Sequence, residues 1–264
     1  MSTFDLTERA VDGGSPRELF LFVQGTTTYA YTSADSTIVL GGTTYAKEAV
    51  SSGPIDYSQE EGSGGAEIHL PAKNTVAQKF KDYPPSTPVF VTIFRVHRNG
   101  AAAVRFVGRV SQGSFEGAAA KLTCAPLRGL LTRAVPGLNY QKQCNWPLYG
   151  PGCGLLAAAF RDSAAISAVN GLLVSSPAFS ARPPGWFAFG RFELNGERRY
   201  ILEHAGDTVT LIAPIPGLDV GAQVDVFAGC DRSETTCKVK FNNLVRFLGF
   251  TRIPNNNPYV GRMS

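Results

Sequence analysis

The stretch that decides the fold class is VFVTIFRVHRNGAAAVRFVGRV, residues 89–110. Apolar residues alternate in its first half, which places Val89, Val91 and Ile93 on one face of an extended chain. Asn99-Gly100 then separates this half from a second alternating run. Asn-Gly suits a two-residue hairpin turn because both turn positions need a positive φ. The stretch therefore predicts a long hairpin in a sheet with one buried face.

The composition extends this prediction to the rest of the chain. The 264 residues include 28 Gly and 17 Pro, and only 17% are charged. This balance favours many short strands and turns over long solvated helices. TIVLGGTTYA (37–46) predicts two strands around a Gly-Gly turn. After residue 166, further strands are predicted in WFAFGRFEL, RRYILEHA, TVTLIAP and AQVDVFAGC, with an Asn195-Gly196 hairpin between the first two.

One helix is predicted in the N-terminal half, over AKNTVAQKFKDY (72–83). Its spacing places Val76, Phe80 and Tyr83 on one side, and Pro84-Pro85 would end it. With strands on both sides of this segment, the chain is expected to be mainly β with short helices.

A change in composition predicts a domain boundary near residue 135. The segment AVPGLNYQKQCNWPLYGPGCG (134–154) holds three Pro, four Gly and two Cys, which suits an irregular crossover better than a sheet. We expect an N-terminal β domain over 1–135 and a C-terminal β domain over 136–264, ending in an extended tail. Each half contains an Asn-Gly hairpin, so the two domains, both barrel-like or sandwich-like, are expected to be related.

Charge and hydropathy exclude several classes of function. A net charge of +4, spread along the chain, gives no basic stripe for sequence-specific nucleic-acid binding. The polar start, MSTFDLTERAVDGGSP, does not resemble a secretory signal, so the chain is expected to be made in the cytosol. No apolar run approaches the roughly 18 residues that span a bilayer, and stable membrane insertion is not expected.

Four of the five cysteines form two pairs, each in a loop rich in turn residues. Cys144 and Cys153 enclose eight residues, and Cys230 and Cys237 enclose six. Zinc ribbons usually place two to four residues within a pair, so these wider spacings favour a larger inorganic cluster such as iron–sulfur. Zinc remains an alternative, as does a set of buried thiols without metal. The fold expectation therefore includes an irregular, cysteine-rich metal site in the C-terminal half.

The other candidate residues favour structural roles. Cys124 alternates within a predicted strand, which favours a core thiol. Glu60-Glu61 is expected in a solvated loop, and Asn242 and Asn243 are expected to brace the loop near Cys237. The three histidines are expected as exposed or hydrogen-bonded strand residues: His69, His97 and His204. GRVSQG (108–113) misses the spacing of a nucleophile elbow. Catalytic motifs are absent from the sequence, so an enzyme is not expected, and a hydrolase is the least favoured alternative.

Two runs of sequence carry a resemblance to a known family. QCNWPLYGPGCG and GCDRSETTCKVKFNNLVRFLGF, with Pro254 after the second, resemble the C-terminal signature of the phage tail-tip hub family. That family includes the minor tail protein L of lambda-like siphophages and the hub protein of gene transfer agents. The resemblance implies a [4Fe-4S] cluster held by Cys144, Cys153, Cys230 and Cys237, whereas Cys124 has no counterpart.

The resemblance also implies a structural function. Such a protein forms a homotrimeric ring at the tail tip of a virion assembled in the host cytoplasm. The ring joins the six-fold tube of a long non-contractile tail to the three-fold central fibre or receptor-binding protein. The implied partners are the distal tail protein, the central fibre and the tape-measure protein. The competing interpretation from the residues alone is a zinc-stabilised, β-rich binding module.

Overall fold

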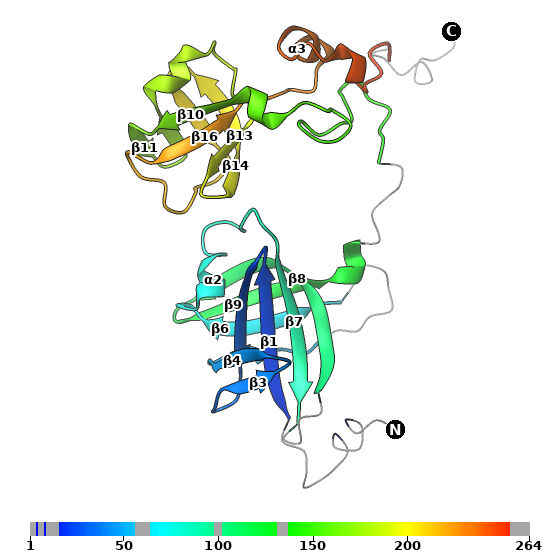
Figure 1. Cartoon of the computed structure of the whole chain (residues 1–264), viewed down its shortest axis with the longest axis vertical. Coiled ribbons are helices and arrows are strands. Elements are labelled where there is room, and N and C mark those ends of the chain that lie inside the picture. The colour runs from blue at the N-terminus through cyan, green and yellow to red at the C-terminus, as the bar shows by residue number, and fades with distance from the viewer. Residues whose placement is uncertain are drawn as a thin grey trace, which may run out of the picture. The chain divides into compact units, whose positions relative to one another are not determined.

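The computed structural model describes Phe4, Glu8 and residues 16–55, 64–97, 102–130 and 137–253 (Figure 1). The chain divides into two compact units, residues 1–133 and 134–264. Each unit is built on its own antiparallel-rich sheet with few short helices, so the expectation of a mainly β chain is confirmed. No helix within the described ranges is long and apolar enough to cross a membrane.

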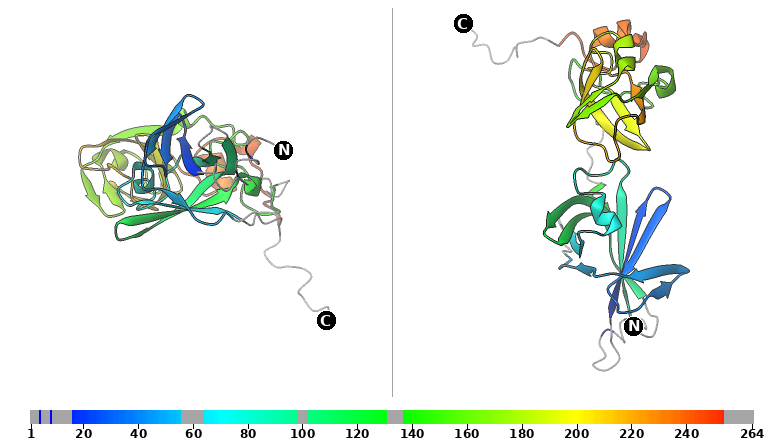
Figure 2. Two further views of the ribbon diagram at one scale, coloured as in Figure 1. Left: turned by 90° about the horizontal axis from the view of Figure 1, so that it is seen from below. Right: turned by 90° about the vertical axis from the view of Figure 1, so that its left-hand side faces the viewer.

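The N-terminal unit contains a nine-stranded sheet in the order β3-β4-β2-β1-β7-β8-β9-β6-β5. Two further views show that its strands fan out into a strongly curved sheet (Figure 2). In chain order, the strands are β1 (Arg17–Gln24), β2 (Thr27–Thr32), β3 (Ile38–Leu40), β4 (Thr43–Lys47), β5 (Ser51–Ser52), β6 (Ala66–Pro71), β7 (Val89–Val96), β8 (Ala102–Glu116) and β9 (Ala119–Pro126).

Strand β1 is covered on both faces because its apolar residues do not alternate with polar ones. Phe20 and Phe22 belong to the main core, which β6, β7, β8 and β9 complete. Leu19 faces the opposite side and packs in a second cluster with Tyr45 of β4. The run LFLFV in β1 is therefore a strand buried on two sides.

The predicted long hairpin is confirmed as β7 and β8. The two strands are antiparallel, and Val89, Val91 and Ile93 are buried on the core face. Asn99-Gly100 lies outside the described residues. Strand β8 extends to Glu116, past the level of Val89 where β7 begins, and continues its pairing with β9.

The predicted helix over 72–83 is wrong in length. Only α2 (Thr75–Gln78) is helical, and it begins after Asn74, whose side chain accepts hydrogen bonds from two backbone N–H groups of the first turn. The next residues form hydrogen bonds between positions i and i−3, as in Phe80 N to Ala77 O at 2.9 Å, so the coil tightens and ends. Val76 and Phe80 enter the core as predicted, whereas Tyr83 is exposed.

The C-terminal unit contains a seven-stranded sheet in the order β10-β16-β13-β14-β15-β12-β11. In chain order, the strands are β10 (Arg161–Ala165), β11 (Ala168–Asn170), β12 (Leu173–Ser175), β13 (Arg191–Leu194), β14 (Glu197–Ala205), β15 (Thr208–Leu211) and β16 (Gln223–Phe227). The short helices are η1 (Leu127–Leu130) in the N-terminal unit and η2 (Ala157–Phe160), η3 (Pro177–Ala181), α3 (Glu234–Val239) and η4 (Leu244–Arg246) in this one.

The predicted strand WFAFGRFEL is correct only in its second half. Its first four residues form turns, with Ala188 N bonded to Gly185 O at 3.2 Å, and Phe189 adopts a positive φ of 63°. Gly190 follows, where a Cβ would lie 2.1 Å from Phe227 O, so the chain approaches β16 before β13 begins. The Asn195-Gly196 turn is confirmed, with both residues at positive φ between β13 and β14.

The two sheets share an arrangement of five strands. In the N-terminal unit, the β5–β6 hairpin is followed by α2 and then by the meander β7-β8-β9, whose last strand pairs with β6. In the C-terminal unit, the β11–β12 hairpin is followed by η3 and then by the meander β13-β14-β15, whose last strand pairs with β12. The suspected relation between the two halves therefore has a counterpart in topology, although the flanking strands differ.

Candidate metal centre

The four paired cysteines line a single pocket of the C-terminal unit. Cys144 and Cys153 lie in the segment without regular structure before η2, Cys230 lies shortly after β16, and Cys237 lies in α3. The remaining lining residues are Trp146, Leu148, Leu155, Arg232, Phe241, Asn243 and Arg246. Two segments far apart in sequence thus place their thiols around a common space.

Backbone turns in both segments aim the cysteines at this pocket. Tyr149 and Arg232 are non-glycine residues at positive φ, of 60° and 63°. Gly152 lies against the Trp146 indole, where a Cβ would be 2.1 Å from a ring carbon, so only glycine allows this close approach. Ser233 caps α3 by accepting a hydrogen bond from Thr236 N at 3.1 Å, which fixes the helix that carries Cys237.

Backbone hydrogen bonds join the two segments directly. Cys144 N donates to Arg232 O at 2.9 Å, and Asn145 N donates to Leu248 O at 2.8 Å. The Asn145 side chain also donates to Leu248 O, at 3.1 Å. These bonds hold the first cysteine pair against the chain that surrounds the second.

Nitrogen donors lie close to three of the four sulfurs. Arg232 N donates to Cys230 Sγ at 3.3 Å, and Leu248 N donates to Cys144 Sγ at 3.4 Å. Asn243 Nδ2 lies 3.8 Å from Cys153 Sγ. Hydrogen bonds of this kind stabilise negative charge on sulfur, and they surround the thiolate ligands of iron–sulfur sites.

Burial and mutual repulsion keep two of the thiols protonated. The pKa of Cys237 is raised to about 11, first by burial and then by negative charge on the other three cysteines of the pocket. The pKa of Cys230 is also raised, mainly by burial. A metal that binds these cysteines as thiolates must therefore displace their protons at neutral pH.

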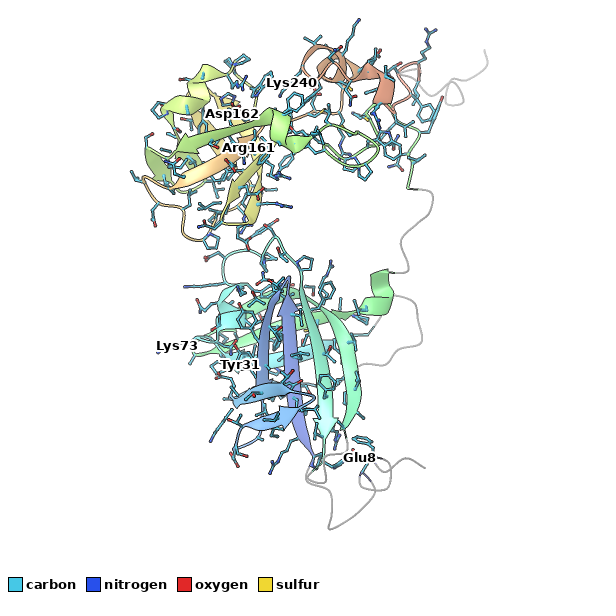
Figure 3. The ribbon with its side chains drawn as sticks, in the orientation of Figure 1. Glu8, Tyr31, Lys73, Arg161, Asp162 and Lys240 are labelled. Carbon is cyan, nitrogen blue, oxygen red and sulfur yellow. The ribbon has the colours of Figure 1, made fainter. Side chains whose placement is uncertain are left out.

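Lys240 lies beside this region, at the end of α3 (labelled in Figure 3). Its Nζ donates to Trp186 O and, at 2.7 Å, to Gly229 O, which ties α3 to the segments just before β13 and just after β16. Burial lowers the pKa of Lys240 to about 8, while negative charge on Cys230 and Asp231 acts in the opposite direction.

The donor set suits a cluster. Four thiols, with N–H groups close to three of them, are the type of donor set that iron–sulfur centres use. Within the described ranges, no group of three or more His, Cys, Asp or Glu side chains is arranged to hold a metal ion, so the metal site expected from the sequence stays a prediction.

The other predicted residues occupy structural positions. Cys124 is buried in β9, and burial raises the pKa of its thiol to about 12, as expected for a core residue. His69 is exposed on β6, and His204 is buried with Nε2 facing two backbone carbonyl oxygens. His97 is buried at the end of β7, where its Nε2 lies 2.7 Å from Glu8. Glu60-Glu61 lies outside the described residues.

The bracing role predicted for the Asn242-Asn243 pair is confirmed for Asn243. Its side chain donates to Cys153 O at 2.8 Å. Asn242 supplies a turn with a φ of 47°. In α3, Cys237 is buried and Val239 is exposed.

Several residues of the pocket were missed by the sequence analysis. Arg246 places its guanidinium over Gly154, where a Cβ would lie 2.7 Å from it. Arg232 also lines the pocket, so two cationic side chains border the thiols. Their only sequence signal is proximity to the cysteines, since Arg246 follows Cys237 by nine residues with no recognisable spacing.

Comparisons with known proteins connect the chain with phages and phage-like particles. Residues 185–257 match a family described as "Phage conserved hypothetical protein BR0599". A solved structure described as "Virion of native gene transfer agent (GTA) particle" contains a chain with a similar fold. The TM-score is 0.77 at 18% sequence identity, and the match covers 99% of this chain and 95% of that one. No curated protein sequence matches.

Proposed function

We propose that this protein is a structural hub of the tail tip of a long-tailed, non-contractile phage or phage-like particle. The observation that carries the proposal is the similarity of fold over nearly the whole chain to a protein of a gene transfer agent virion. The phage family matched by residues 185–257 covers Cys230 and Cys237, so it supports the same assignment in the part of the chain that forms the pocket. The proposed role is assembly, without an enzymatic activity.

The proposed site holds a [4Fe-4S] cluster through Cys144, Cys153, Cys230 and Cys237. The cluster supplies a covalent cross-link between distant segments and, in this proposal, a structural function. All seven strands of the C-terminal sheet lie between Cys153 and Cys230. Joining these two cysteines therefore closes the chain at the points where it enters and leaves the sheet, which lowers the entropy of the unfolded state.

The proposed assembly is a homotrimeric ring between the six-fold tail tube and the three-fold central fibre. Three copies of a chain with two related sheets present six similar units, which suits a junction between these symmetries. The five-strand arrangement common to the two sheets supports this part of the proposal. The proposed partners are the distal tail protein, the central fibre or receptor-binding protein, and the tape-measure protein.

Metal analysis of the anaerobically purified protein tests the cluster. We expect about four irons and four acid-labile sulfides per chain, with the broad visible absorption of a cluster. Zinc without iron would instead support the zinc-stabilised binding module. Folded protein free of both metals would overturn the proposed site.

Single substitutions test the assignment of the ligands. Cys144→Ser, Cys153→Ser, Cys230→Ser and Cys237→Ser should each remove most of the iron and lower the soluble yield, because each deletes one thiolate. Cys124→Ser and Cys124→Val are the matched controls, since Cys124 is buried in the other unit and should leave the iron content unchanged. Equal iron loss in all five positions would contradict the assignment.

A further inference from the structure

Asn243 contacts one cysteine from each pair. Its Nδ2 donates to Cys153 O at 2.8 Å and lies 3.8 Å from Cys153 Sγ. Its backbone N donates to Cys237 O at 3.0 Å, and its backbone O accepts a hydrogen bond from the Cys237 thiol at 3.3 Å. A single residue therefore bridges the segment before η2 and the C-terminal end of α3.

We propose that Asn243 is a positioning residue that assembles the four-thiol pocket before metal binds and then tunes the bound cluster through Cys153. The first part concerns the metal-free protein, and the second part rests on the proposed function. Asn243 places a side-chain N–H donor near a cysteine sulfur, whereas Arg232 donates to Cys230 Sγ from its backbone.

The hydrogen bonds of Asn243 change in a defined way when thiols become ligands. The Cys237 thiol loses its proton and can no longer donate to Asn243 O. The Asn243 amide, in contrast, faces a charged sulfur on Cys153, and charge-assisted hydrogen bonds are roughly twice as strong as neutral ones. A donor to a ligand sulfur also stabilises the reduced cluster, which carries more negative charge, and so raises its reduction potential.

The loaded protein tests the tuning role. Asn243→Leu keeps a side chain branched at Cγ and removes its donor, and Asn243→Asp keeps the shape and replaces the donor by a carboxylate. We expect both variants to lose iron to a chelator about tenfold faster than the wild type, within the range found for other outer-sphere changes. Their midpoint potentials, measured by redox titration, should be more negative, with Asn243→Asp shifted further because of its charge.

Asn242→Gly is the matched control for this experiment. Asn242 precedes Asn243, and within the described part of the chain its side chain makes no hydrogen bond. Its φ of 47° is well tolerated by glycine. Asn242→Gly should therefore retain the wild-type potential and rate of iron loss. An unchanged potential and rate in Asn243→Asp and Asn243→Leu would overturn the tuning role.

The metal-free protein tests the assembly of the pocket independently of any cluster. Alkylation by iodoacetamide, followed by mass spectrometry, measures how accessible each thiol is. In Asn243→Leu, Cys153 and Cys237 should react several-fold faster than in the wild type, while Cys124 in the other unit should not change. If the wild type binds no iron, the proposed cluster fails, and this experiment still decides the positioning role. Unchanged alkylation would overturn it.

Discussion

At the scale of single residues, His204 shows how burial determines a protonation state. Its side chain is buried within β14 and packs against the Phe187 ring at 4.8 Å between centroids. Nε2 lies 3.3 Å from Phe179 O and 3.1 Å from Gly206 O, so it carries the ring proton and donates. Nδ1 then accepts from Phe187 N at 3.5 Å, which requires a neutral ring.

The stability of the C-terminal unit should therefore depend on pH. The pKa of His204 is lowered, chiefly by burial, against the opposing effect of the two carbonyl oxygens. Between the folded pKa and the unfolded value of about 6.5, the unfolded state binds more protons. The free energy of unfolding should be fully maintained above about pH 6.5 and fall as the pH drops through the folded pKa.

Urea unfolding at a series of pH values from 8 to 5 measures this dependence. His204→Gln should remove much of it, because the titrating group is lost. His69→Gln, at an exposed position of β6, is the control and should keep the wild-type slope. A wild-type slope in His204→Gln would show that another group is responsible.

At the scale of secondary structure, α2 shows how a capping side chain stabilises a very short helix. Asn74 is buried and accepts from Val76 N at 2.9 Å and Ala77 N at 3.4 Å. These bonds satisfy the first amide groups of a helix that is only four residues long. The cap places Val76 in the core of the N-terminal unit.

Removal of the cap should destabilise the N-terminal unit. Asn74→Ala leaves two buried N–H groups without their acceptor and should lower the free energy of unfolding by about 1–2 kcal/mol. Denaturant unfolding measures the loss. Lys73→Ala, at the exposed neighbouring position labelled in Figure 3, should change stability by less than about 0.5 kcal/mol. Equal effects of the two substitutions would contradict the capping role.

At the scale of the whole molecule, two units with separate cores share a hairpin-and-meander arrangement. The core of the first gathers around Phe20 and Leu122, and that of the second around Phe192 and Ile201. Different side chains thus fill two sheets of similar connectivity. The cysteine pocket belongs to the second unit alone, so the site does not depend on the position of the first.

The proposed ring predicts a trimer for the cluster-loaded, full-length chain. A trimer is expected because a closed ring of two-unit chains with three-fold symmetry supplies six similar units. Analytical ultracentrifugation over a range of micromolar concentrations measures the state directly. A loaded chain that stays monomeric or forms dimers would contradict the proposed ring, while leaving the metal site to be judged by its iron content.

Patterns within short stretches predicted much of the fold. Alternation in VFVTIFRV and the Asn195-Gly196 dipeptide were sufficient for their strands and turn, because strand faces and positive φ values are local properties. The length of the helix over 72–83 was overestimated because tertiary contacts, which are not local, decide where this helix ends. Its apolar spacing is compatible with a longer helix. In the structure, however, Phe80 reaches the core from a tighter turn that follows α2.

The candidate site depends partly on local sequence patterns and partly on the tertiary structure. The loops and glycines around Cys144–Cys153 and Cys230–Cys237 are visible in the sequence, and they predicted a place where the chain could wrap a metal. That the two pairs face one pocket depends on the seven-stranded sheet between them, which returns the chain to its starting point. The contacts of Asn243 and Arg246 also form because the chain after the sheet comes back to the segment that holds Cys144 and Cys153. They were not predictable, because a hydrogen bond across 90 residues leaves no local pattern.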